Sequence, residues 1–151
     1  MPHAGSKHGR VRARRCAVQG LYQWGVTKAS PRDIVREFVA DREMIKVDID
    51  YFTELMREVP AKFNDLFASI EPTIDRSWAQ IGPVEQSILL IGTYELQYCE
   101  RIPWRVVLNE GVELCKMFGP EDAHKYINGV LEKIARNCRP IEVDGNLTRN
   151  T

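Results

Sequence analysis

A sustained helical repeat constrains the fold of this chain more than any other feature of its sequence. Between Ile49 and Ile70, apolar side chains recur at alternating spacings of three and four residues, which places them on one face of a helix. They are Ile49, Phe52, Met56, Val59, Phe63, Leu66 and Ile70. Pro60 lies inside this pattern without changing its register. We therefore predict one helix from about Asp48 to Ile70, kinked where the proline removes the hydrogen bond to the Met56 carbonyl.

The rest of the sequence follows the same period, so we predict an all-α fold with about seven helices. Proline marks the expected start of four of them, in the pairs Ser30-Pro31, Gly82-Pro83, Ile102-Pro103 and Gly119-Pro120. The other expected segments are 9–24, 31–40, a short turn around Trp78, 84–99, 103–118 and 121–136. Gly119 is expected to end its helix as a left-handed cap. Residues 139–151 show no periodicity, and we expect a mobile tail there.

Length and hydropathy limit the class of protein. The chain has 151 residues, which is the size of one domain or of two small helical subdomains. Its longest apolar run, from Ile88 to Gly92, is far shorter than the roughly 18 residues of a membrane span. The N-terminus has no apolar signal region. We therefore expect a cytoplasmic protein that does not enter a membrane.

The residues that usually carry chemistry are sparse. Four cysteines stand at positions 16, 99, 115 and 138, inside predicted helices and without a CxxC pair. Buried free thiols explain them better than a disulfide or a zinc site. The sequence lacks the glycine-rich phosphate loops of nucleotide-binding folds. His124 is the only histidine in a predicted helix, where a lone histidine is more often a surface residue than a catalytic base. We expect no metal, no cofactor and no enzymatic activity.

The distribution of charge is more informative than the net charge, which is zero. Residues 1–32 contain seven lysines and arginines and no acid, so the rest of the chain carries a net charge of −7. In the predicted helix 9–24, steps of 100° place Arg12, Arg15, Gln19 and Tyr22 opposite the apolar face. Arginine binds phosphates, and tyrosine stacks on the bases of single-stranded RNA. The residues alone favour a nucleic-acid interface and a solvated basic face equally.

Three strings of the sequence resemble the NusB family of transcription antitermination factors. They are RRCAVQGLYQW, GPVEQSILLIGTYEL and IPWRVVLNEGVELCKMFGPEDAHKYINGVLEKIAR. The resemblance covers the first predicted helix and most of residues 76–136. It implies two packed helical subdomains, which we place at 9–75 and 76–138, after a flexible basic arm at 1–8.

The resemblance also implies a function and partners. Family members bind the boxA element of ribosomal RNA leaders together with NusE, a small-subunit ribosomal protein. The complex joins elongating RNA polymerase with NusA and NusG and opposes Rho-dependent termination. Members differ in whether they form a homodimer, so a homodimer is a further possible partner state.

The same resemblance assigns roles to individual residues. The implied RNA-binding residues are Arg10, Arg12, Arg14, Arg15, Tyr22, Asp122, Lys125 and Tyr126. Val11 interrupts the arginine run where relatives often carry arginine, and Tyr126 replaces the usual phenylalanine. Asp122 could accept a hydrogen bond from a base, although a carboxylate in a first helical turn also complements the helix dipole. Glu85 is implied at the NusE surface and is expected in a first turn as well.

Two glycines depart from the family pattern. Gly20 and Gly111 occupy core-facing positions where relatives commonly carry alanine. Each is expected to cost roughly 0.5–1 kcal/mol in helix propensity, unless close helix packing requires it.

Two other functions remain open at this stage. The chain could be an accessory RNA-binding module related to the NusB-like domain of RNA cytosine methyltransferases. It could also be a helical scaffold that binds only proteins. An RNA-binding assay would separate the scaffold from the other two.

Overall fold

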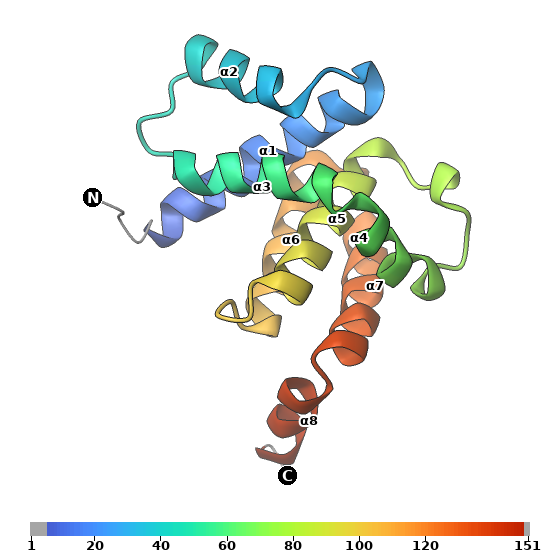
Figure 1. Ribbon diagram of the computed structural model, residues 1–151. Helices are drawn as coiled ribbons and strands as arrows, with labels where there is room; N and C mark the ends of the chain where they lie inside the picture. The colour runs from blue at the N-terminus through green and yellow to red at the C-terminus, as the bar shows by residue number, and fades with distance from the viewer. Residues whose placement is uncertain (1–5, 150–151) are drawn as a thin grey trace. The chain divides into compact units, whose positions relative to one another are not determined.

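The regular elements that the structure describes in this chain are all helices. The computed structural model describes residues 6–149, and within them the α-helices and the two 3-10 turns, η1 and η2, follow one another without a strand (Figure 1). In order, the elements are α1 (Lys7–Thr27), α2 (Pro31–Asp41), α3 (Ile49–Ala61), α4 (Phe63–Ile70), η1 (Glu71–Thr73), η2 (Trp78–Gln80), α5 (Pro83–Tyr98), α6 (Trp104–Phe118), α7 (Ala123–Cys138) and α8 (Pro140–Arg149). The all-α prediction is confirmed.

The chain divides into two compact units, the first ending at Phe63 and the second beginning at Asn64. This division lies earlier than the boundary between 75 and 76 that the sequence suggested. Lys7 and His8 belong to α1, so the expected flexible arm does not extend to residue 8. Residues 1–5 of that arm lie outside the described residues. No helix in the part of the chain that the structure describes has the length and apolar character of a membrane span.

In the first unit, α1, α2 and α3 pack against one another around a shared core (Figure 1). The apolar face predicted for α1 is buried, with Ala13 and Ala17 fully covered. Phe38 of α2 meets Phe52 of α3, with ring centroids 5.3 Å apart. A Cβ at Gly20 would lie 2.7 Å from the sulfur of Met56, so this glycine occupies a close helix crossing.

The long kinked helix expected at 48–70 is instead two helices. α3 ends at Ala61 and α4 begins at Phe63, with Lys62 between them at φ −102° and ψ 15°. Pro60 has no N–H and its ring crowds the carbonyl four residues earlier, so the helix weakens just there. The Lys62 N–H closes α3 by donating to the Glu58 carbonyl at 2.9 Å. The apolar repeat continues across this break with the same spacing, so the sequence pattern does not reveal that the helix is interrupted.

In the second unit, α5 is the central helix and contacts both α6 and α7. Every residue of α5 from Ser87 to Leu96 is buried. The Leu131 side chain of α7 lies against two glycines, since a Cβ at either Gly92 or Gly111 would lie 2.7 Å from one of its methyl groups. The close helix packing that requires a glycine at position 111, despite its low helix propensity, is therefore present.

The left-handed cap expected at Gly119 is wrong. Gly119 has φ −93° and ψ 173°, an extended conformation, and its N–H donates to the Cys115 carbonyl at 2.8 Å. The left-handed residue of this connection is Asp122, with φ 69°, directly before α7. Aspartate tolerates this conformation better than most residues because its short side chain can bond locally.

The expected tail without helical structure is also wrong, because residues 140–149 form α8 (Figure 1). Arg139, only 7% exposed, fixes its start. The guanidinium donates to four backbone carbonyls at the end of α5 and the turn after it, namely those of Glu95, Leu96, Cys99 and Ile102, at 2.6–2.9 Å.

Glu142 completes this anchor. One carboxylate oxygen accepts from Arg139 at 3.1 Å, and the other accepts from the N–H of Trp104, the first residue of α6, at 2.9 Å. Val143 is also buried, at 1% exposed. Contacts distant in sequence, rather than an apolar period, hold this helix, and a period-based prediction cannot detect them.

Candidate nucleic-acid interface

The candidate interface of the first unit begins at the start of α1. Ser6 caps the helix, because its hydroxyl oxygen accepts from the Gly9 N–H at 2.9 Å. The first turn contains no acid, although a carboxylate there would complement the helix dipole. The positive end of the helix thus adds to the positive charge of the basic side chains that follow.

Three of the four arginines predicted to bind RNA lie on the accessible part of α1. Arg10, Arg12 and Arg15 are half-buried, and Arg12 donates to the His8 carbonyl at 3.3 Å. Tyr22, two turns further along, is 43% exposed. Cations and an aromatic ring thus share one helix, an arrangement that suits phosphate binding and base stacking.

Arg14 does not belong to this group. It is 3% exposed, and its guanidinium lies over the ring of Tyr51 with 5.5 Å to the centroid. A buried cation on an aromatic face stabilises the packing of α1 on α3. Successive residues of a helix point in directions 100° apart, so four arginines spread over residues 10–15 cannot all lie on one surface.

The connection between α2 and α3 adds two cations that sequence reasoning missed. Arg42 donates to the amide oxygen of Gln19, and its positive charge acts on Cys16. Asp48 fixes the other end of the connection, because its N–H donates to the Gly9 carbonyl at 3.1 Å. Lys46 and Arg12 both line a small open depression of about 310 Å³ at the second of these anchors, which Gly9 and Asp48 also line. No local sequence signal links Arg42 or Lys46 to α1, since only the fold brings them alongside it.

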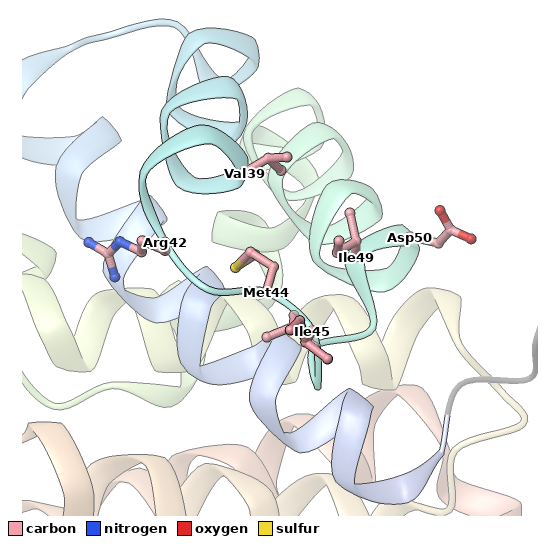
Figure 2. Close-up of a pocket in the computed structure, with 7 residues that line it drawn as sticks. Val39, Arg42, Met44, Ile45, Ile49 and Asp50 are labelled. Carbon is pink, nitrogen blue, oxygen red and sulfur yellow. The ribbon is translucent and has the colours of Figure 1, made fainter.

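A second depression, of about 390 Å³, lies on the α2–α3 connection (Figure 2). Val39, Ile49 and the 83% exposed Ile45 give it an apolar lining. Figure 2 shows Asp50 projecting away from this lining and Arg42 at the opposite side. This surface suits apolar contacts rather than phosphate binding.

In the second unit, the predicted site residues gather at the start of α7. Asp122 and Lys125 are exposed, and His124 is half-buried. Asp122 is the N-cap residue of α7, and its left-handed backbone directs the chain into the helix. The carboxylate is therefore at the positive end of the helix dipole, where a structural role and a base contact are compatible.

Tyr126 is not a freely exposed ring. It is half-buried, and the guanidinium of Arg76 lies over its ring with 4.1 Å to the centroid. Arg76 is itself paired with Asp75, whose carboxylate accepts from its Nε at 2.8 Å. Burial raises the pKa of Tyr126, and the hydroxyl lies next to Asp75. The face expected to receive a base is thus covered by an arginine that sequence reasoning did not select.

Glu85 lies in the first turn of α5 and is half-buried. Its carboxylate folds back over the N-cap residue Gly82, since a Cβ on that glycine would lie 2.8 Å from a carboxylate oxygen. Burial raises the pKa of Cys115 to about 11, with the charge of Glu85 as a second cause. The carboxylate therefore acts within its own unit, whether or not it also faces a partner.

All four cysteines are free thiols, as predicted. Cys99 and Cys115 are buried, Cys16 is partly covered, and Cys138 is exposed, so the expectation of burial is wrong for Cys138. Within residues 6–149, no cluster of histidine, cysteine or carboxylate side chains has the arrangement of a metal site.

Comparison with known proteins places the chain in a family. The sequence profile of the NusB family matches residues 11–136. The transcription antitermination protein NusB of Nitrosomonas europaea is 44% identical over 148 residues, which is 98% of this chain and 89% of that protein. The chain belongs to the NusB family. The transcription antitermination protein NusB of Edwardsiella ictaluri is 41% identical over 131 residues, covering 87% of this chain and 94% of its own length.

A solved structure supports the NusB fold independently. T. maritima NusB superposes with a TM-score of 0.74 over 92% of this chain and 99% of its own, at 22% identity. The match to the NusB family begins inside α1 and ends inside α7. Arg12, Arg15 and Tyr22 lie within it, whereas Lys7, Arg10 and the whole of α8 lie outside.

Proposed function

We propose that this protein is a transcription antitermination factor that binds boxA RNA of ribosomal RNA leaders together with NusE and opposes Rho-dependent termination. Membership of the NusB family supports the proposal, since its curated relatives are named transcription antitermination proteins. The single observation that most directly supports RNA binding is the group of accessible side chains on α1, namely Arg10, Arg12, Arg15 and Tyr22.

The chemistry of that group suits a single strand better than a duplex. Arginines neutralise phosphates and release counterions, which makes the affinity dependent on salt. An exposed tyrosine offers a flat face for an unpaired base, which a paired base inside a helix cannot reach. Arg42 and Lys46 extend the positive charge beside α1.

The partners follow from the same proposal. NusE would bind the second unit at a surface that includes Glu85, and the pair would join RNA polymerase with NusA and NusG in the cytoplasm. A basic ribosomal protein suits an acidic surface, because opposite charges accelerate association. The modest number of cations on α1 makes NusE a requirement for tight RNA binding.

The test is an electrophoretic shift assay with a labelled boxA RNA and a scrambled RNA of equal length, with and without NusE. We expect selective binding that NusE strengthens and that Arg12→Ala and Arg15→Ala weaken. Arg36→Ala is the matched control, because Arg36 is an exposed arginine of the same unit that pairs with Asp33 at 3.9 Å. Equal binding of both RNAs, unchanged by Arg12→Ala, would contradict the proposal.

The two alternative functions give different results in the same assay. A protein-only scaffold would bind NusE and no RNA. An accessory module of a methyltransferase would bind RNA without any gain from NusE.

A further inference from the structure

The covered ring of Tyr126 raises the question of which group meets RNA in the second unit. The tyrosine is half-buried, its hydroxyl lies beside Asp75, and the Arg76 guanidinium lies 4.1 Å from its ring centroid. The Arg76 side chain is 46% exposed. A molecule that approaches this ring from the side of the arginine meets the guanidinium first.

We propose that Arg76 is the RNA-contacting residue of the second unit, and that Asp75 and Tyr126 are positioning residues that hold its guanidinium flat for a base. The inference rests on the proposed function. A planar guanidinium can stack on an aromatic ring with one face and on a nucleobase with the other. Asp75 engages Nε at 2.8 Å, so the two Nη groups remain directed elsewhere and can donate to a phosphate or a base edge.

The segment that carries Arg76 is built to hold it in place. It joins η1 to η2, and η1 contacts α7, the helix that carries Tyr126. After Arg76, the Ser77 N–H donates to the amide oxygen of Gln80 at 2.9 Å. Trp78 packs edge-on against Phe67, with 5.6 Å between ring centroids. The arginine is therefore presented by a fixed turn, although 50 positions separate it from Tyr126.

The charges in this part of the second unit explain why stacking, rather than electrostatic attraction, should provide most of the affinity of Arg76 for RNA. The charges of Arg76 and Asp75 cancel one another, and the start of α7 carries the exposed acids Glu121 and Asp122 beside the exposed cation Lys125 in sequence. A surface with so little net positive charge attracts phosphates weakly. A preoriented flat cation still provides a stacking face and directed donors, which do not depend on a net charge.

The experiment measures boxA RNA binding, in the presence of NusE, for Arg76→Ala, Arg76→Lys, Tyr126→Phe and Tyr126→Leu. We expect Arg76→Ala to weaken binding about ten-fold, within the range for one lost stack. Arg76→Lys should recover little, because an ammonium group is not planar. Tyr126→Phe should bind like the wild type, since the ring and not the hydroxyl supports the arginine.

Two double variants and a control separate positioning from stability. Tyr126→Leu should weaken binding as much as Arg76→Ala, and the double variant that combines these two changes should lose no more than either single one, because both changes remove the same stack. The neutral pair Asp75→Asn with Arg76→Gln should still bind weakly, which excludes an unpaired Asp75 charge as the cause. Arg136→Ala is the matched control, with a side chain also 46% exposed and paired with Glu132 at 3.3 Å. Circular dichroism confirms that each variant is folded.

The outcomes distinguish this inference from the proposed function. If Arg76→Ala binds like the wild type while folded Tyr126→Leu does not, a base stacks directly on the tyrosine and the inference is wrong. If neither variant matters but Arg12→Ala still weakens binding, RNA does not use this site, and the inference fails while the proposed function stands. If Arg12→Ala has no effect either, the proposed function fails.

Discussion

The arginines at the start of α1 are the clearest case in which identical residues have different roles. Arg14 is buried on Tyr51, whereas Arg12 and Arg15 remain accessible. We expect Arg14→Ala to lower the free energy of unfolding by about 1–3 kcal/mol, because it removes packed alkyl and guanidinium groups from a closed site. Arg15→Ala should change stability by less than about 0.5 kcal/mol. Urea denaturation followed by circular dichroism measures both.

RNA binding should give the reverse order for these two residues. Arg15→Ala should weaken the affinity, whereas folded Arg14→Ala should bind boxA RNA like the wild type. A stable Arg14→Ala variant with weakened RNA binding would mean that the buried arginine becomes accessible in the complex.

The salt dependence of RNA binding belongs to the residue scale as well. With Arg14 buried, the accessible cations of α1 are Lys7, Arg10, Arg12 and Arg15. For single-stranded RNA, four phosphate contacts give a slope of log affinity against log salt of about −2.8. Titrations at several salt concentrations measure it. A slope steeper than about −3.5 would show that cations outside α1, such as Arg42 and Lys46, also contact phosphates.

Among the elements, α8 depends on one side chain. Arg139 satisfies four carbonyls at the end of α5 and in the turn after it, while Glu142 satisfies the first N–H of α6. We expect Arg139→Ala to lower the free energy of unfolding by about 3 kcal/mol, because buried carbonyls lose their donors. Lysine should not restore it, since an ammonium group has fewer donors and no planar fork. Arg136→Ala, a change at a more exposed arginine three residues earlier in α7, should have little effect in the same urea titration.

Glu85 tests the partner surface at the start of α5. We expect Glu85→Lys to slow association with NusE in stopped-flow measurements at low salt, with binary RNA binding unchanged. The same carboxylate complements the dipole of its helix, so both Glu85→Lys and Glu85→Gln should lower stability by about 0.3–1 kcal/mol. Glu85→Gln therefore serves as the control for stability. If both variants associate with NusE at the wild-type rate, NusE binds elsewhere.

At the scale of the whole molecule, the cysteine thiols make the free energy of unfolding depend on pH. The pKa of Cys115 is about 11 in the folded chain against an ordinary 9.0, chiefly because of burial. The folded state keeps a proton that the unfolded chain releases, so the stability from this group is fully present below about pH 9 and is lost as the pH rises through about 11. We expect the stability difference between the wild type and Cys115→Ala to shrink over that interval, measured by urea denaturation.

Alkylation gives an independent measurement of the same property. Iodoacetamide at pH 8 should modify the exposed Cys138 first and the partly covered Cys16 more slowly. Cys99 and Cys115 should react only when the chain unfolds. Rapid modification of Cys115 in the native protein would contradict its burial.

The sequence predicts the features of this molecule that depend on near neighbours in the chain. Apolar periodicity and proline placed most helices, and the apolar face of α1 is buried as expected. Side-chain direction within a run of arginines requires the packing of α3, which buries Arg14. The break at Lys62 leaves the apolar register intact, so no pattern marks it.

The residues that the sequence missed share one property, which is that their partners are distant in the chain. Arg42 meets Gln19, Arg76 meets Tyr126, and Arg139 meets the end of α5. An isolated arginine between predicted helices has no periodicity to interpret. Only the fold shows whether such a side chain is solvated, stacked or buried.

The anchor at Arg139 also sets an order of events during protein synthesis. Arg139 lies 37 to 44 positions after the carbonyls that it binds. At a synthesis rate of about 5–20 residues per second, several seconds pass between the appearance of those carbonyls and of their donor. The helices α1 to α3 pack against one another within the first unit, which ends at Phe63. This unit can therefore form its own packing before the hydrogen bonds of Arg139 in the second unit are made. The nascent chain therefore acquires its arginine-bearing α1 surface before the end of α5 is secured.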